Sequence, residues 1–301
     1  MDYFCFESVA QVEKPVLMDF HEREENIAFS IGRSLEEFRR CAKKNQKEMA
    51  ACFDVSVGQY RKYEAGVDIP KTHAVARWSA ITGAPMPLLL KYTDYAGFFP
   101  EEEMQCIAFF GYLSKASDRD FYAVLSLLTG KDQLLNYIAP HDEVLDGDLA
   151  VADVCADYYY RVSKNLEAMR QFHRMTKEEM SAILGVTCTT YNRYITRHDQ
   201  ISLSFLFYAR AHAALRIKTS WADTGRTFYA LVNRRRIHRI SLLNEIFRHL
   251  NEEEKSGLME MLHFFGERRA EVSRVRSALA DKDIDFEGIL AINGANITSA
   301  I

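Results

Sequence analysis

Apolar residues recur at three- and four-residue intervals along most of the chain, which is the spacing of one face of an α-helix. A first long helix is predicted over residues 26–44, with its apolar face at Ile31, Leu35, Phe38 and Ala42. The body of the chain lacks the strong alternation of apolar and polar residues that marks half-buried strands, and it contains six prolines. The pattern therefore predicts an all-α protein.

Two shorter helices are predicted between residues 45 and 66. Asn45 and Glu48 have the spacing of a capping box, in which side chains bind free backbone N–H groups at the start of a helix. Ser56 and Gln59 repeat this spacing and start a second helix. Gly66 ends that helix, because glycine readily takes the left-handed backbone of a helix end.

The second of these helices has two different faces. Tyr60 and Tyr63 point to the interior, and the outward positions are small, polar or basic: Val57, Gly58, Arg61 and Lys62. Two short helices joined by a tight turn, the second exposing such residues, form the helix-turn-helix arrangement that places one helix in the major groove of DNA.

The stretch resembles the helix-turn-helix of phage repressors of the Cro/CI or Xre type. That signature runs Gln-x-x-x-Ala, then hydrophobic-Ser-x-x-x-aromatic-x-x-hydrophobic-Glu-x-Gly. The matching positions are Gln46, Ala50, Val55, Ser56, Tyr60, Tyr63, Glu64 and Gly66. The resemblance implies that Arg39 of the preceding helix pairs with Glu64, and that Ser56–Glu64 is the recognition helix.

By this resemblance, some side chains lie where family members touch base edges and others lie at or near the DNA backbone. The base-edge set is Val57, Gly58 and Lys62, the backbone set is Gln46, Ser56 and Gln59, and Arg61 lies on the same open face. Lys62 can bind guanine acceptors and Val57 can meet a thymine methyl, whereas Gly58 has no side chain to read a base. Backbone contacts or DNA shape are therefore expected to carry more of the specificity.

The chain contains an internal repeat. A shift of 131 positions places Leu35–Tyr63 over Leu166–Tyr194 without a gap, and nine of these 29 positions are identical. After each copy a related motif follows, Phe110-x-x-Leu113 in the first half and Phe247-x-x-Leu250 in the second. The predicted fold is therefore all-α, with two tandem lambda-repressor-like helix-turn-helix domains, each followed by a helical pair.

The second copy departs from the signature. Ile195 stands where the first copy has Glu64, so Arg170 is expected to lose its partner. Arg197 replaces the glycine that ends the recognition helix. The expected DNA contacts of this copy are Lys177, Thr187, Cys188, Thr189, Thr190 and Arg193, with Arg193 the best suited to a base contact. The alternative is that this copy packs, dimerises or holds a partner.

These patterns divide the chain into consecutive segments. They are an acidic N-terminal arm (1–25), the first helix-turn-helix domain (26–92), a helical pair (93–140), an acidic linker (141–157), the second, eroded helix-turn-helix domain (158–220), a helical pair (221–280) and a C-terminal tail (281–301). The arm is either a partly ordered tail or an anchor through Tyr3, Phe4 and Phe6. The C-terminal tail is either an arm that pairs with another subunit or a floppy end.

The net charge of −4 is unevenly distributed. Residues 26–72 carry nine Lys and Arg against six Asp and Glu, whereas residues 101–157 carry three against twelve. The stretch Arg226–Arg239 holds five arginines and no acid, and it either clamps phosphates or forms a solvated helix face. An overall acidic chain with a basic reading domain is compatible with DNA binding.

Other functional classes lack support in the sequence. There is no glycine-rich phosphate loop and no GxSxG motif, so no enzyme and no cofactor is predicted. Six cysteines without a CxxC pair and nine histidines without ligand spacing predict no metal site. A redox-sensor role for Cys188 is the disfavoured reading. No apolar run approaches a membrane span and no secretion signal is present, so a cytoplasmic, nucleoid-associated protein is expected.

The sequence thus predicts a bacterial or phage-type transcriptional regulator that binds double-stranded DNA through Ser56–Glu64. The favoured mode is a homodimer whose two chains read a palindrome. The other mode uses both motifs of one chain as a built-in pseudo-dimer on half-sites about one DNA turn, roughly 34 Å, apart. The competing interpretation is a protein-interaction module, whose decayed copies sequester a partner such as an antitoxin or another regulator.

Overall fold

The computed structural model describes residues 14–106, 108–129, 155, 157–196, 202–216 and 227–260. The secondary structure within these ranges is helical, apart from one isolated bridge between Lys71 and Ser204, so the predicted all-α class is confirmed. No helix in the described ranges is both long and apolar enough to cross a membrane. The chain divides into two compact units, Met1–Leu250 and Asn251–Ile301, and residues 252–260 of the second unit are helical.

Several predicted segments fall outside the described residues. They are the aromatic residues near the N-terminus (3–6), most of the acidic linker (141–157), Arg197 and the C-terminal tail (281–301). The expectations for these segments stay predictions.

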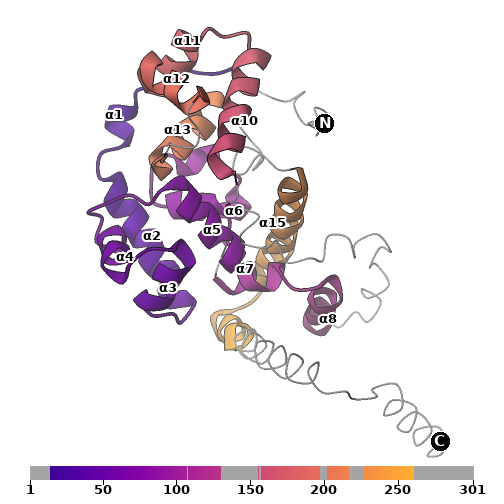
Figure 1. Cartoon of the computed structure of the whole chain (residues 1–301). Coiled ribbons are helices and arrows are strands. Elements are labelled where there is room, and N and C mark those ends of the chain that lie inside the picture. The colour runs from indigo at the N-terminus through magenta and orange to yellow at the C-terminus, as the bar shows by residue number, and fades with distance from the viewer. Residues whose placement is uncertain are drawn as a thin grey trace, which may run out of the picture. The chain divides into compact units, whose positions relative to one another are not determined.

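The first half of unit 1 is a series of short helices (Figure 1). They are α1 (Phe20–Arg23), α2 (Ile27–Cys41), α3 (Gln46–Phe53), α4 (Val57–Glu64), α5 (Thr72–Thr82), the 3-10 helices η2 (Met86–Leu90) and η3 (Ala96–Phe98), α6 (Glu101–Met104), α7 (Ala108–Ser114) and α8 (Asp118–Thr129). Residues 101–114 do not form one continuous helix. The chain leaves the helix at Gln105 and buries Cys106 before α7 begins.

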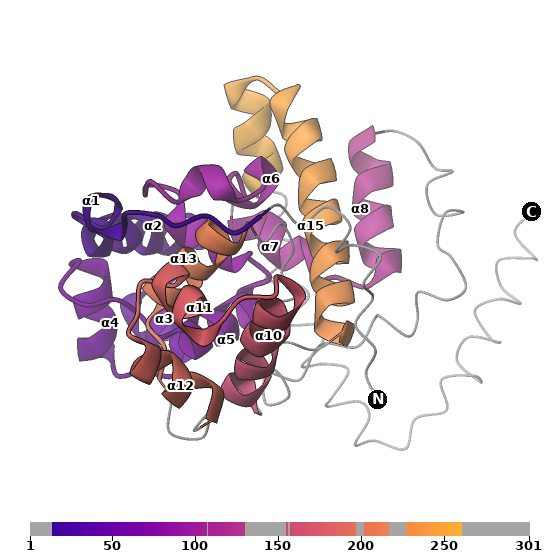
Figure 2. The ribbon, with the colours of Figure 1, turned by 90° about the horizontal axis from the view of Figure 1, so that it is seen from above.

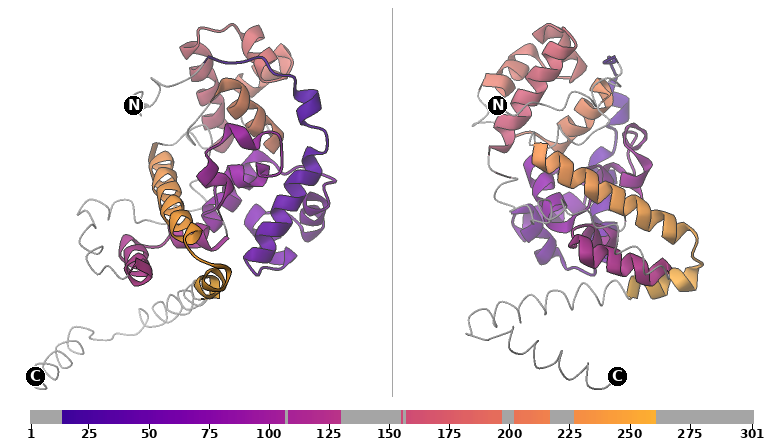
Figure 3. Two further views of the ribbon diagram at one scale, coloured as in Figure 1. Left: turned by 180° about the vertical axis from the view of Figure 1, so that it is seen from behind. Right: turned by 90° about the vertical axis from the view of Figure 1, so that its right-hand side faces the viewer.

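The second half repeats the first in part. Its helices are α10 (Tyr158–Phe172), α11 (Lys177–Ile183), α12 (Cys188–Thr196), α13 (Phe205–Leu215) and α15 (Thr227–Arg248). α7 packs against α15 (Figures 1 and 3). The helical pairs expected after each copy are unequal, because α15 is one continuous helix of 22 residues where the first half has the shorter α6 and α7.

Equivalent backbone features recur at a nearly constant offset. α2 and α10 are both 15 residues long and begin 131 positions apart. Left-handed residues recur at the same offset, as at Asp54 and Gly185 between the two short helices of each copy. For α5 and α13 the offset is 133, because the second copy has two more residues in the preceding loop. Helices α2–α5 are called here the first copy, and α10–α13 the second copy.

Aromatic rings fill the core of the first copy. The Trp78 ring meets Phe38 edge-on with centroids 5.0 Å apart, and it stacks on Phe53 at 5.9 Å. In the second copy the position of Trp78 is taken by Ala211, and that of Phe38 by Met169. Both residues line a cavity of about 30 Å³. Smaller side chains therefore take the place of aromatic rings in the second copy, and a cavity remains beside them.

The described end of the N-terminal arm lies on the second copy (Figure 2). The Val16 N–H donates to the Ala214 carbonyl at 2.8 Å. Phe20 is buried, and the Glu24 carboxylate accepts two hydrogen bonds from Arg210, each 2.5 Å long. The part of the arm after residue 13 is therefore anchored rather than a free tail.

The closest approach of α2 to α4 depends on Gly32. A Cβ atom added there would lie 2.6 Å from the carbonyl oxygens of Tyr63 and Glu64. We expect Gly32→Ala to destabilise the fold by about 1–3 kcal/mol, because it forces α2 away from α4. Gly58→Ala is the matched control: its Cβ meets nothing closer than 3.9 Å, so it should stabilise by roughly 0.5–1 kcal/mol through helix propensity. Urea unfolding of the two variants measures both effects, and equal shifts would contradict the close approach.

Candidate nucleic-acid interface

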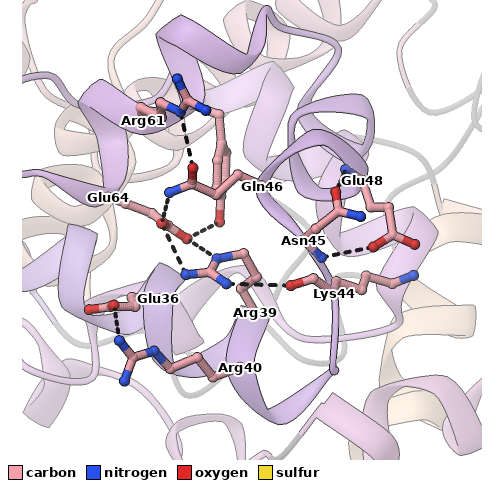
Figure 4. A network of polar contacts seen from close by, with 10 residues as sticks. Glu36, Arg39, Arg40, Lys44, Asn45, Gln46, Glu48, Arg61 and Glu64 are labelled. Carbon is pink, nitrogen blue, oxygen red and sulfur yellow. Dashed lines mark hydrogen bonds and ion pairs between the residues drawn. The ribbon is translucent and has the colours of Figure 1, made fainter.

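One carboxylate joins three helices of the first copy (Figure 4). Glu64, at the end of α4, accepts hydrogen bonds from Arg39 Nε of α2 at 2.6 Å, from Gln46 Nε2 of α3 at 2.8 Å and from Tyr60 OH of α4 at 2.9 Å. The ion pair predicted between Arg39 and Glu64 is therefore confirmed. It is part of a larger network that sets the position of α4 against α2 and α3.

The network determines the charge states of its members. Burial by itself raises the pKa of the Glu64 carboxyl, but the hydrogen bonds from Arg39, Gln46 and Tyr60 lower that pKa below its usual range. Burial and the neighbouring Glu64 charge raise the pKa of the Tyr60 hydroxyl. Glu64 is thus ionised and Tyr60 protonated at neutral pH, which are the states that these hydrogen bonds need.

Gln46 is more constrained than a simple phosphate contact requires. Its amide nitrogen donates to Glu64, and its amide oxygen accepts from Arg61 Nε at 3.1 Å. One amide N–H remains for an acceptor outside the protein, since a primary amide has two. Arg61 is exposed and reaches Gln46 from α4 (Figure 4). The network therefore holds two predicted DNA contacts, Gln46 and Arg61, next to each other.

The other predicted residues of the first copy lie at the start and on the outer face of α4. The Ser56 hydroxyl caps the helix by accepting from the Gln59 N–H at 3.1 Å, and the Gln59 side chain donates to Asp68 at 2.6 Å. Gly58 is exposed. Lys62 is exposed as well, and no described residue engages its ammonium group in a hydrogen bond or ion pair. Val57 is half-buried.

The second copy replaces the Glu64 interaction rather than losing it. Arg170 loses the partner equivalent to Glu64, as the sequence predicts, because Ile195 stands there. It instead donates to Glu167, one turn earlier on α10, from its Nε at 3.0 Å and its Nη2 at 2.5 Å. Tyr191 of α12 donates to the same carboxylate at 3.4 Å, as Tyr60 does to Glu64. The hydrogen bond from Arg170 lowers the pKa of the Glu167 carboxyl more than any other contact.

The backbone contact of this arginine is the same in both copies. Arg39 Nη1 donates to the Lys44 carbonyl at 3.4 Å, and Arg170 Nη1 donates to the Met175 carbonyl, 131 positions later, at 2.6 Å. Both arginines therefore hold the loop that leads into the next helix.

The outer face of α12 carries the predicted contacts of the second copy. Thr187 accepts from the Thr190 N–H at 3.1 Å, which is the capping bond that Ser56 makes in the first copy. Thr189 and Arg193 are exposed. Lys177 begins α11, but Glu178 and Glu179 share its first turn. These acids weaken Lys177 as a phosphate contact, because they repel the same phosphate.

Cys188 lacks the surroundings of a reactive thiol. Its Sγ lies 3.4 Å from a Glu178 carboxylate oxygen and 3.6 Å from Asn192 Nδ2. Partial burial and the Glu178 carboxylate raise the pKa of this thiol. A redox sensor needs a thiolate at neutral pH, so these neighbours act against that role.

The arginine run in α15 is not a phosphate clamp at its C-terminal end. Arg236 and Arg239 are buried, and Arg239 Nη1 donates to the Ser114 and Ala116 carbonyls at 2.8 and 2.7 Å. Both readings of the run from the sequence, a clamp and a solvated face, are wrong for these two arginines. Arg239 instead binds free carbonyls at the end of α7.

Two ion pairs were not predicted from the sequence, for different reasons. Glu167 is one of the identical positions of the repeat and lies three residues before Arg170, so helical spacing was a usable signal. The ion pair of Glu24 with Arg210 joins residues 186 positions apart. No local pattern indicates such a contact.

Comparisons of the chain with protein-family models, with curated proteins and with solved structures gave no match. No relative therefore supplies a role for these residues.

The titration of Glu64 gives a testable pH dependence. Because the pKa of this carboxyl is lowered in the folded protein, its contribution is complete above the ordinary value near 4.5 and is lost as pH falls through the lowered pKa. We expect Glu64→Gln to destabilise by about 1–3 kcal/mol at pH 7. The difference from wild type should shrink on acidification, as measured by urea unfolding between pH 7 and roughly pH 3.

Glu36→Gln is the control for this experiment. Glu36 pairs with Arg40 at 2.6 Å on the exposed face of α2, so its loss should change stability by about 0.5 kcal/mol or less. A pH-independent deficit in Glu64→Gln would contradict the role of the ionised carboxylate.

Proposed function

We propose that this protein is a sequence-specific DNA-binding transcriptional regulator, and that α3 and α4 form a helix-turn-helix of the Cro/CI or Xre type. In this proposal α4 is the recognition helix and enters the major groove of double-stranded DNA. The carrying observation is the network centred on Glu64, which holds α4 against α2 and α3 while leaving Lys62 exposed.

The chemistry of the α4 surface supports this proposal. Lys62 has no described partner and can donate to guanine acceptors. Gly58 lets the helix backbone come close to a groove wall, since it adds no side chain. Arg61, beside Gln46, supplies a second positive charge suited to phosphate. Lys62 is thus the one strong donor of α4 for direct contact with bases. The remaining affinity is proposed to come from contacts with the DNA backbone.

The second copy is proposed to assist DNA binding through α12. Arg193 is exposed and offers a planar guanidinium that fits guanine in a bidentate way. The acidic first turn of α11 acts in the opposite direction. A cytoplasmic, nucleoid-associated location and a homodimer remain predictions of the sequence.

The second candidate function is a protein-interaction module that sequesters a partner such as an antitoxin or another regulator. The observation that favours it is the acidic start of α11, with Glu178 and Glu179 beside the predicted contact Lys177. Binding in that case would respond weakly to salt, because no counterions are released from DNA.

The proposal is tested by selecting bound duplexes from a random-sequence pool and titrating the best one at about 50 and 200 mM salt. We expect a specific site whose affinity falls steeply with salt. Lys62→Ala should weaken that site about fivefold to a hundredfold, since one good base contact is worth roughly 1–3 kcal/mol.

Lys164→Ala is the control variant. Lys164 is an exposed lysine of α10, with its ammonium 5.3 Å from the centre of the Tyr160 ring, and it lies outside the proposed reading surface. Its loss should leave the affinity for the site unchanged. Failure to enrich any duplex, or equal effects of the two substitutions, would refute the DNA-binding function and leave the protein-interaction module.

A further inference from the structure

The backbone hydrogen bonds that join the two copies are reciprocal. The Thr72 N–H donates to the Leu203 carbonyl at 2.9 Å, and the Phe205 N–H donates to the Pro70 carbonyl at 2.9 Å. Thr72 and Phe205 are equivalent positions at the offset of 133, and so are Pro70 and Leu203. The first copy thus contacts the second through the same equivalent positions as the second contacts the first. Such reciprocal contacts are the mark of a two-fold axis.

The residues between these bonds lie at the centre of the contact. Lys71 and Ser204, again 133 positions apart, form the isolated antiparallel bridge. Each precedes the first residue of a long helix, α5 and α13 respectively, and these two helices pack against each other. Equivalent elements of the two copies therefore face each other.

A second pair of contacts obeys the same symmetry. Glu24, just before the first copy, binds Arg210 of the second copy. Its equivalent at the offset of 131 is Cys155, just before the second copy. The nearby Arg77 of the first copy acts to lower the pKa of the Cys155 thiol, which burial raises. Arg77 and Arg210 are themselves equivalent at the offset of 133.

The helices that follow the two copies also meet through equivalent side chains. Phe110 of α7 and Phe247 of α15 occupy the same position of the duplicated Phe-x-x-Leu motif. Their rings touch in a T-shaped arrangement with centroids 5.6 Å apart. Three separate contacts thus follow one local two-fold axis within a single chain.

This symmetry determines how α4 and α12 are presented. Two elements related by a two-fold axis have the same coordinate along that axis. Therefore α4 and α12 lie toward the same end of the axis. In Figures 1 and 2, α4 and α12 lie to the left of α7 and α15, with α5 and α13 between them. A placement toward one end is what the proposed function requires, because the two reading helices of a dimeric DNA-binding protein also face the DNA from one side.

The two helices offer different chemistry at equivalent outward positions. Lys62 of α4 corresponds to Arg193 of α12, and Gly58 corresponds to Thr189. A lysine is a flexible point charge, whereas an arginine presents a planar fork that suits guanine. The two helices therefore do not select the same bases.

We propose that one chain, rather than a homodimer, is the DNA-reading unit, and that its target consists of two unlike half-sites in inverted orientation. This inference rests on the proposed DNA-binding function. The inverted orientation follows from the two-fold axis between the copies, and the unlike half-sites follow from the different side chains of α4 and α12.

The experiment uses the full-length chain and the best-bound duplex recovered from a random-sequence pool. Native mass spectrometry of the complex should give one chain per duplex at saturation. Two further duplexes, each with one half scrambled, divide the readout between the helices. For the wild type, scrambling either half should lower the affinity by at least about fivefold. Lys62→Ala should remove this loss for one scrambled half, and Arg193→Ala should remove it for the other half.

Lys164→Ala and helical content by circular dichroism control for folding, because all three side chains are exposed. Two chains on a perfect palindrome, or Arg193→Ala without effect on either half, would overturn the single-chain inference while leaving DNA binding in place. Recovery of no specific duplex would instead remove the proposed function itself, and the inference with it.

Discussion

A buried carboxylate beneath a surface helix needs compensation, because leaving one partner of a buried ion pair alone costs about 3–5 kcal/mol. Glu64 is compensated by hydrogen bonds from side chains on three helices, and these bonds hold α2, α3 and α4 together. The second copy keeps such a centre but moves the charge from α12 to Glu167 of α10. Tyr191 links that carboxylate to α12 through a hydrogen bond of 3.4 Å. This link is longer than the hydrogen bonds that join Glu64 to Arg39 and Gln46 in the first copy.

The contact between the copies extends this unit to both halves. The halves are joined by backbone hydrogen bonds around Lys71 and Ser204, by the Glu24–Arg210 ion pair and by the contact between rings of α7 and α15. A single contact would leave the halves free to pivot, whereas three oppose rotation in different directions. The second copy, with its cavity beside Ala211, thus lies next to the first copy, whose core holds the stacked rings of Phe53 and Trp78.

Local chemistry made much of the fold predictable. The capping box at Asn45 and the inward tyrosines follow from short-range spacing, the pairing of Arg39 with Glu64 was implied by the resemblance, and all are present. The contact between the copies was not predictable, since it joins residues more than a hundred positions apart through backbone atoms that carry no sequence signal. The burial of Arg239 was missed for the same reason. A run of arginines indicates positive charge, but only the tertiary fold shows that Arg239 donates hydrogen bonds to carbonyls at the end of α7.

In the proposed single-chain unit, each of the two reading helices can accept substitutions that the other does not share. In a homodimer every substitution appears at both half-sites, so the two halves of the target must stay alike. In a single chain, Arg193 and Lys62 vary independently. The second binding event is also intramolecular, so no separate association of subunits has to be driven by the DNA contacts. In the proposed DNA-reading unit, the packing of α5 against α13 joins the two copies, so that a helix with one strong donor, such as α4, would act together with an equally sparse partner.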